Sequence, residues 1–149
     1  MTTILTTQDD ERFIKLTKCL DLEYFENIGD RAGDYLEYNE VTEPHAVFLK
    51  LDGDNTIACG SFREIDRDSI EIRRLFVAKE HRRKGIAFEI MNKLEGEALS
   101  RGYSNAYLVT GVNNKASNGL YKKLGYSYIE NFGMFKDDEV CVCMKKSLK

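Results

Sequence analysis

Apolar and polar positions alternate along residues 45–51, a period that predicts a half-buried strand. The following Asp52-Gly53-Asp54-Asn55 is a strong hairpin turn, so residues 56–65 should return antiparallel. A second turn, Asp66-Arg67-Asp68, leads into a strand at residues 70–77. These segments predict a three-stranded meander.

Helical spacing appears on both sides of the meander. A short strand at residues 3–7 precedes a helix that Asp9 or Asp10 can cap and that runs to about residue 27. Gly29 and Gly33 break this pattern, and residues 31–38 can form a second short helix. After the meander, the apolar side of another helix ends at Gly102; its members are Ala87, Ile90, Met91, Leu94 and Ala98.

The last third of the chain predicts a buried strand, a helix and a strand pair. Residues 106–109 are apolar, residues 113–124 suit a helix closed by Gly125, and residues 126–130 and 139–144 read as strands. The predicted order is β-α-(α)-β-β-β-α-β-α-β-β.

Composition adds bounds to this picture. The chain has 149 residues, a length for one domain (residues 1–149), and its 42% hydrophobic and 32% charged residues are ordinary for a globular protein. No apolar run approaches the length of a membrane span, and the first ten residues lack the pattern of a signal peptide. We therefore expect a cytoplasmic protein with no membrane partner.

The cysteines and histidines give little indication of chemistry. Cys141 and Cys143 alternate along a predicted strand and so share a face, but no His or Cys pair at ligand spacing accompanies them. We expect buried, reduced thiols and no metal. His45 and His81 stand isolated in the sequence and are weak catalytic candidates.

The net charge of −3 is unevenly distributed. Residues 21–43 carry a single base, Arg31, against eight acids: Asp21, Glu23, Glu26, Asp30, Asp34, Glu37, Glu40 and Glu43. Bases gather instead around residues 73–84. This asymmetry can mean a cleft with an anionic cofactor at one end and a cationic substrate at the other, or merely solvated helix faces.

The stretch Arg82-Arg83-Lys84-Gly85-Ile86-Ala87 joins the strand at residues 70–77 to a helix. A small-residue turn at a helix N-terminus presents backbone N–H groups without intrahelical partners, beside the positive end of the helix dipole. Such a turn can bind a pyrophosphate, with Gly85 and Ala87 allowing close approach and the three cations adding mobile positive charge. Taken alone, the pattern also fits an ordinary basic surface turn.

Two motifs in order give the context, and with them the chain resembles the GNAT superfamily of acyl-CoA N-acyltransferases. The first is Arg73-Arg74-Leu75-Phe76-Val77 followed by Arg82-x-x-Gly85-x-Ala87, and the second is Asn114-x-x-Ser117-x-x-Leu120-Tyr121-x-Lys123-Leu124-Gly125-Tyr126. The resemblance implies an α/β (α+β) fold with a mixed, mostly antiparallel sheet flanked by helices. It also implies an N-acetyltransferase with acetyl-CoA as cosubstrate.

The resemblance assigns residues as well. The strand backbone at Leu75, Phe76 and Val77 would pair with the pantetheine arm, and the turn comprising Arg82, Arg83, Lys84, Gly85, Ile86, Ala87 and Phe88 would hold the pyrophosphate. Asn114 would bond to the cofactor arm with help from Ser117, and Tyr121 would stand near the thioester sulfur. In a subgroup pattern of the family, Val109 replaces an acid and Phe135 a tyrosine, so the roles of those two groups are in doubt here.

The chemistry needs a base more than an acid. The acceptor ammonium has a pKa near 10, so freeing its lone pair at pH 7 costs roughly 4 kcal/mol, whereas the CoA thiolate, with a pKa near 8.5, needs modest help. We predict Glu71 as the base, directly or through water, and Tyr121 as the donor to the thiolate. Glu71 could instead be a solvated partner of Arg73, and Tyr121 a core aromatic. A backbone N–H near Leu75 is the candidate oxyanion donor.

The acceptor is predicted from the resemblance and from charge. The resemblance implies that the first helices and nearby loops wall the acceptor site, and here that segment is acidic. This favours a small cationic amine, such as a polyamine, an aminoglycoside or an amino-acid derivative, while protein or peptide amines remain open. A non-catalytic acyl-CoA sensor is the alternative class. Nucleic-acid binding fits poorly because the chain is acidic and lacks a P-loop. A homodimer is possible by family habit.

Overall fold

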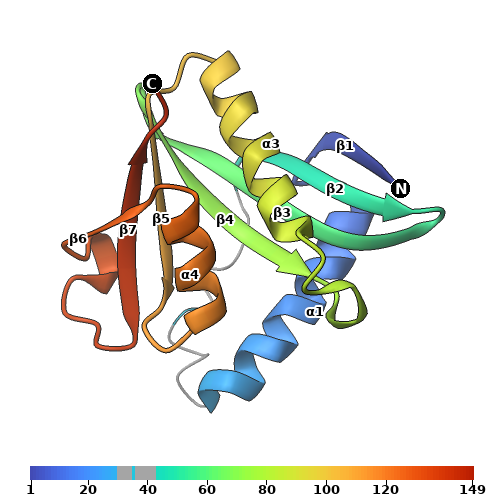
Figure 1. Cartoon of the computed structure of the whole chain (residues 1–149), viewed down its shortest axis with the longest axis horizontal. Coiled ribbons are helices and arrows are strands. Elements are labelled where there is room, and N and C mark those ends of the chain that lie inside the picture. Colours follow the sequence, from blue (N-terminus) through green and yellow to red (C-terminus); the bar gives the residue numbers. More distant parts are fainter. Residues whose placement is uncertain (30–34, 36–42) are drawn as a thin grey trace. The chain divides into compact units, whose positions relative to one another are not determined.

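The structure is a computed structural model that describes residues 1–29, 35 and 43–149 (Figure 1). Its seven strands are β1 (Thr2–Thr7), β2 (Ala46–Asp52), β3 (Asn55–Asp66), β4 (Ser69–Val77), β5 (Asn105–Gly111), β6 (Ser127–Ile129) and β7 (Cys141–Ser147). The described helices are α1 (Glu11–Ile28), α3 (Ile86–Ser100) and α4 (Lys115–Lys123).

The strands form one mixed, mostly antiparallel sheet in the order β1-β2-β3-β4-β5-β7-β6. β4 and β5 run parallel, whereas the pairs β1–β2, β2–β3, β5–β7 and β6–β7 are antiparallel. By their internal contacts the residues divide into two compact units, Met1–Arg63 with Arg73–Leu94 and Glu64–Ile72 with Glu95–Lys149.

In the first unit, the predicted hairpin joins β2 to β3 with the register Asp52↔Asn55. Gly53 has a φ of 60°, the left-handed conformation that glycine adopts without steric cost. β1 lies along β2, from Thr2↔Leu51 to Thr7↔Ala46 (Figure 1). These strands carry the inward-facing residues of the core.

Helix α1 begins at a capped turn and buries its apolar stripe against the strands. Asp10 is the N-cap: its carboxylate accepts the Arg12 backbone N–H at 2.9 Å, and the hydrogen bond from the Arg12 side chain holds the Asp10 pKa well below its usual range. Phe13 and Leu16 of the helix form a core cluster with residues of β2, β3 and β4. The strand residues are Val47, Leu49, Cys59 and Phe76.

The first turns of α3 contact β3 closely at a glycine. A Cβ built on Gly60 would lie 2.7 Å from Cγ2 of Ile90 and 3.0 Å from Cδ1 of Leu94. Only a residue without a side chain permits this helix to approach the strand so closely. Ile90, Met91 and Leu94 are fully buried as a result.

In the second unit, β5 pairs with β7 from Asn105↔Ser147 to Gly111↔Cys141, and the first residues of β4 pair in parallel with Asn105–Tyr107. Ala106, Leu108 and Thr110 are buried along β5, the alternation expected of a strand covered on one face. Helix α4 ends before Gly125, whose φ is 99°, and Tyr126 N–H donates to Tyr121 O at 2.9 Å.

The predicted order of elements is confirmed in the described residues, with boundaries shifted by one to three residues. Asp10, and not Asp9, caps the first helix. The bracketed helix at residues 31–38 lies outside the described residues, Tyr35 excepted. In the described part of the chain, no helix is long and apolar enough to span a bilayer.

Candidate active site

Strand β4 is interrupted at Arg74. This residue has a φ of 57°, the left-handed region that costs a non-glycine residue about 1–2 kcal/mol. Arg74 donates to Thr17 O and to Asp21 of α1, whereas Arg73 lies 3.8 Å from Glu43. A left-handed residue inside a strand is a feature of β-bulges, and we call this interruption the bulge in β4.

The turn after β4 leads directly into α3. Arg83 has a φ of 63° and Gly85 a φ of 77°, and Gly85 O accepts the first helical hydrogen bond, from Glu89 N–H at 3.0 Å. The N–H groups of Ile86 and Ala87 therefore precede the first bond of the helix and point out of its N-terminus. Arg83, Lys84 and Gly85 are exposed, so this end of the helix is accessible to an anion.

Open space lies beside Gly85. Apart from its two chain neighbours, no protein atom lies within 4 Å of a Cβ built on this glycine. Open space, unpaired helix donors and two exposed cations are the features that a pyrophosphate requires. The residues present thus suit the diphosphate of a nucleotide-like substrate.

Arg82 differs from the predicted mobile cation. Its Nε donates to Val77 O at 2.8 Å, its Nη2 donates to Glu23 of α1 at 2.6 Å, and its guanidinium lies 5.4 Å from the centroid of the Phe76 ring. These contacts hold the head group against the end of β4. Arg82 is therefore engaged within the protein, contrary to the expectation of a mobile cation, whereas Arg83 and Lys84 are exposed.

In the second unit, Asn114 is exposed and caps α4. Its Oδ1 accepts the Ser117 backbone N–H at 3.1 Å, which leaves the side-chain NH₂ as the group that can donate to a ligand. Sequence reasoning missed its neighbour Asn118, whose Nδ2 donates to Asn114 O and to Gly111 O. Asn118 thereby ties the end of β5 to the start of α4 and fixes the place of Asn114.

Tyr121 lies on the inner side of α4 and is 7% exposed. Its ring packs edge-on against Tyr126, with 6.0 Å between centroids. Burial raises the pKa of Tyr121 to about 12, so its hydroxyl is protonated at neutral pH. A protonated phenol can donate to an anion, as the predicted role requires.

Glu71 is fully buried in β4, opposite Tyr107 of β5. The alternative of a solvated surface carboxylate is therefore wrong. Burial raises the pKa of the neighbouring Cys143 thiol, and the charge of Glu71 contributes to that rise, which places the two groups near each other. Cys59, Cys141 and Cys143 are buried free thiols, as predicted.

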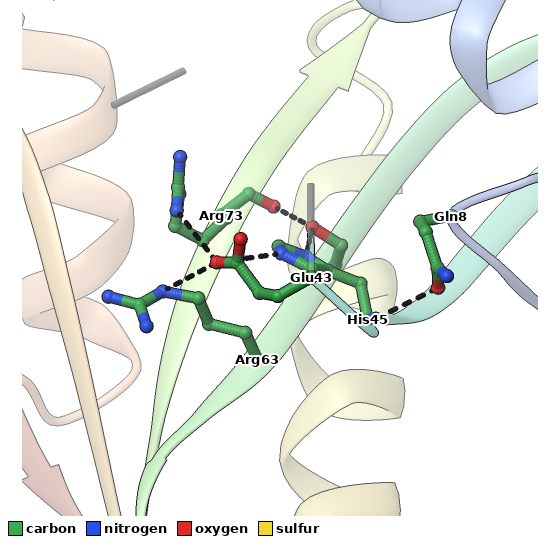
Figure 2. A network of polar contacts seen from close by, with 6 residues as sticks. Gln8, Glu43, His45, Arg63 and Arg73 are labelled. Carbon is green, nitrogen blue, oxygen red and sulfur yellow. Dashed lines mark hydrogen bonds and ion pairs between the residues drawn. The ribbon is translucent and has the colours of Figure 1, made fainter. Parts of the chain in front are cut away.

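His45 stands isolated in the sequence, but in space it lies beside charged residues of other segments. Glu43 Oε1 lies 3.6 Å from His45 Nε2, 3.3 Å from Arg63 Nε and 3.8 Å from Arg73 Nη1 (Figure 2). Burial, with the nearby charge of Arg73, lowers the pKa of His45 to about 4, so the ring is neutral at pH 7. No local pattern could reveal this network, because its members come from different segments.

His45 also contacts Ser61, with 3.1 Å between Nδ1 and Oγ. Ser, His and Glu together suggest a nucleophilic triad. However, Ser61 is 0% exposed, and its Oγ lies 3.0 Å from Arg73 O. A carbonyl oxygen can only accept a hydrogen bond, so the Ser61 hydroxyl is the donor. The hydroxyl proton is therefore used in that bond, and Ser61 is not placed to attack a substrate.

The predicted site residues fall into both units. The first holds Leu75, Phe76 and Val77 with the turn from Arg82 to Phe88, and the second holds Glu71, Asn114, Ser117 and Tyr121. The acidic residues Asp30, Asp34 and Glu37 of the predicted acceptor wall lie outside the described residues.

Several known proteins resemble this chain. It is 32% identical over 99 residues to the uncharacterized N-acetyltransferase YsnE of Bacillus subtilis, a match covering 65% of this chain and 66%, just under two thirds, of YsnE. The crystal structure of a protein assigned as an acyl-CoA N-acyltransferase, from Klebsiella pneumoniae, superposes with a TM-score of 0.82 at 21% identity. That match covers 99% of this chain and 97% of the Klebsiella chain.

A second solved structure shows the same fold with a ligand. The structure of an aminoglycoside 6′-N-acetyltransferase complexed with coenzyme A matches with a TM-score of 0.68 at 20% identity, over 98% of this chain and 97% of that one. Coenzyme A is thus bound in a structural neighbour of this protein.

The family comparison covers both predicted motifs. The family model described as "Acetyltransferase (GNAT) family" matches residues 13–126, well over half of the chain. This range contains β4, the turn before α3, and α4. The chain therefore belongs to the GNAT family of acetyltransferases.

Proposed function

We propose that this GNAT acetyltransferase moves the acetyl group of acetyl-CoA to a primary amine of a small cationic molecule, by direct attack of the amine on the thioester. The cosubstrate assignment rests on the exposed turn at Gly85. Open space lies beside this glycine, and the backbone N–H groups of Ile86 and Ala87 precede the first hydrogen bond of α3. The amides from Arg83 to Phe88 would hold the pyrophosphate, and the β4 backbone from Leu75 to Val77 would align the pantetheine arm. Asn114, with Ser117, would bond to that arm.

The reaction forms a C–N bond and breaks the C–S bond. The acceptor ammonium first loses a proton, for which Glu71 is our base. Because Glu71 has no exposed surface, its burial favours proton transfer through water over direct contact with the amine. The attack develops negative charge on the thioester oxygen, which the N–H of Leu75 would stabilise. Tyr121 would donate a hydrogen bond or its proton to the departing thiolate.

The acceptor proposal rests on the surplus of acids in residues 21–43, eight against one base. Asp21, Glu23 and Glu43 of this segment form ion pairs with arginines. From the sequence alone we assign the acceptor charge to other members of the set, Asp30, Asp34 and Glu37. A structural neighbour at 20% identity is an aminoglycoside 6′-N-acetyltransferase, so aminoglycosides belong in the panel of acceptors to be tested.

The direct test is acetyl-CoA consumption with thiol release across polyamines, aminoglycosides, amino acids and lysine peptides. We expect turnover with one cationic small-molecule class, and loss of most of it in Tyr121→Phe and Glu71→Gln. Preference for lysine peptides would replace the acceptor in this proposal. Binding of acetyl-CoA without any turnover would favour a sensor domain.

The acidic wall has its own test. Charge reversal of Asp30, Asp34 and Glu37 to lysine should raise the KM for the acceptor and leave the KM for acetyl-CoA unchanged. Reversal of exposed Asp54, in the β2–β3 hairpin, is the matched control. Equal acceptor KM values in the two sets would contradict the charge argument.

A further inference from the structure

The bulge in β4 is held by side chains of β3. Ser61 Oγ donates to Arg73 O at 3.0 Å, and Cys59 Sγ donates to Arg74 O at 3.3 Å. Both donors are fully buried. Two consecutive carbonyls around a left-handed residue are thus held by side-chain donors of the neighbouring strand.

The bond at Ser61 has a defined direction. A hydroxyl has one proton, and Ser61 gives it to Arg73 O, so His45 Nδ1 must donate to Ser61 Oγ. The resulting chain runs from His45 N–H through Ser61 O–H to the carbonyl of Arg73. The backbone N–H of His45 donates to Gln8 Oε1 at 3.0 Å (Figure 2). Hydrogen bonds aligned in one direction polarise and strengthen one another.

The side chain of Arg74 holds the other side of the bulge. It is 6% exposed, and its Nη2 lies 3.1 Å from Thr17 O and 2.6 Å from Asp21 Oδ1, both in α1. Burial raises the pKa of Cys59 to about 12, so this thiol keeps the proton that it donates. Contacts with α1 and β3 therefore hold Arg74 in a backbone conformation that is unfavourable for arginine. Strained residues held in this way are common at functional sites.

The residue after the bulge is Leu75. Its side chain points to the α3 face, with Cδ1 3.3 Å from a Cβ built on Gly60, whereas Arg74 points to α1. The direction of the Leu75 N–H is set by the peptide plane that it shares with the Arg74 carbonyl, because a peptide unit is rigid. Holding Arg74 O at Cys59 therefore also aims the N–H of Leu75.

We propose that Ser61 and Cys59 are positioning residues, which fix the bulge at Arg73 and Arg74 so that the Leu75 N–H points at the thioester carbonyl oxygen. This inference rests on the proposed function and adds the residues that orient its oxyanion donor. Neither side chain touches the reacting atoms; each acts through the backbone of β4.

The first test needs no acceptor. In ¹⁵N-labelled protein, the Leu75 amide proton should shift downfield on binding acetyl-CoA but not on binding CoA, which lacks the acetyl carbonyl. This difference between acetyl-CoA and CoA should disappear in Ser61→Ala and persist in Ser61→Thr. It should also be larger in Cys59→Ser, which keeps a donor, than in Cys59→Ala. An equal response of wild type and Ser61→Ala, or no acetyl-dependent shift at all, overturns the inference.

The second test is kinetic and uses the best amine of the panel. We expect Ser61→Ala to lower kcat at least about tenfold while the KM for acetyl-CoA stays within about twofold, since the donor acts in the transition state. Ile57→Val is the matched control: a buried β3 residue whose truncation loosens packing without touching these bonds. An equal loss of kcat in Ile57→Val would show that the effect of Ser61→Ala is a general packing effect, and would overturn the positioning role.

The two tests separate this inference from the function on which it rests. A Leu75 shift that depends on Ser61, with no amine acetylated by the wild type, contradicts the proposed acceptor and supports the positioning role. Turnover by the wild type with no acetyl-dependent shift at Leu75 supports the proposed acetyl transfer, but overturns the role of the Leu75 N–H and with it the positioning role.

Discussion

Nη2 of Arg82 lies 2.6 Å from Oε2 of Glu23, 59 residues earlier in the chain. The contact ties the turn between β4 and α3 to helix α1. Together with the bond from Arg82 Nε to Val77 O, it holds the turn in place before any anion binds. Arg82 therefore has a structural role, and Arg83 and Lys84 are exposed at the turn.

This division predicts different consequences for the two arginines. Arg82→Ala should lower the free energy of unfolding by about 1–2 kcal/mol, because a hydrogen bond and a partly exposed ion pair are lost. Arg83→Ala should leave stability nearly unchanged and raise the Kd of acetyl-CoA, less so at high salt because exposed charges are screened. Denaturant unfolding and calorimetric titration measure both. Similar stability losses in the two variants would contradict the assignment.

Gly85→Ala should weaken acetyl-CoA binding more than it destabilises the fold. A φ of 77° costs alanine about 1–2 kcal/mol, and the added methyl would occupy the open space proposed for the pyrophosphate. Gly53→Ala, at a φ of 60° in the β2–β3 hairpin and likewise without atoms within 4 Å, carries the same backbone cost away from the turn. We expect comparable melting temperatures but a raised Kd in Gly85→Ala alone. Equal Kd values would remove the turn from the binding site.

Tyr121→Phe should lower kcat by about 10²-fold, the usual range for loss of a general acid, with little change in the KM for acetyl-CoA. Because burial raises the pKa of Tyr121 to about 12, the wild-type hydroxyl stays protonated across the usual assay range. The kcat of the wild type should therefore show no fall from this group between about pH 7 and 10. A fall that is absent from Tyr121→Phe would show that the phenol ionises earlier than its burial predicts.

His45 should make stability depend on mildly acidic pH. Its pKa is about 4 in the folded protein against 6.5 for an unperturbed histidine, so between these values the unfolded chain binds the extra proton and the folded one does not. The free energy of unfolding therefore falls as pH is lowered from about 6.5 to about 4, by roughly 3 kcal/mol at most.

The control for this prediction is His45→Asn, which keeps an N–H donor near the position of Nδ1 but cannot titrate. Urea unfolding at several pH values should show the decline in the wild type and a flatter profile in the variant. Identical slopes would mean that other groups cause the acid sensitivity.

The order of elements was predictable because its signals are local. The hairpin at Gly53, the N-cap at Asp10 and the helix that ends before Gly102 each depend on residues within a few positions of one another. The two motifs are local as well, and their order along the chain was enough to indicate the GNAT family. The boundaries moved slightly because side-chain periodicity does not define the last hydrogen bond of an element.

Tertiary structure decided the state of each predicted side chain. Charge and spacing marked Arg82 as a mobile cation, Glu71 as a possible surface partner and His45 as isolated, but the folded chain engages or buries all three. It also places Arg74 in a left-handed conformation, held by donors of β3 and α1. The periodicity of a strand specifies which residues share a face, whereas burial and ion pairing depend on which distant segment comes to lie against that face.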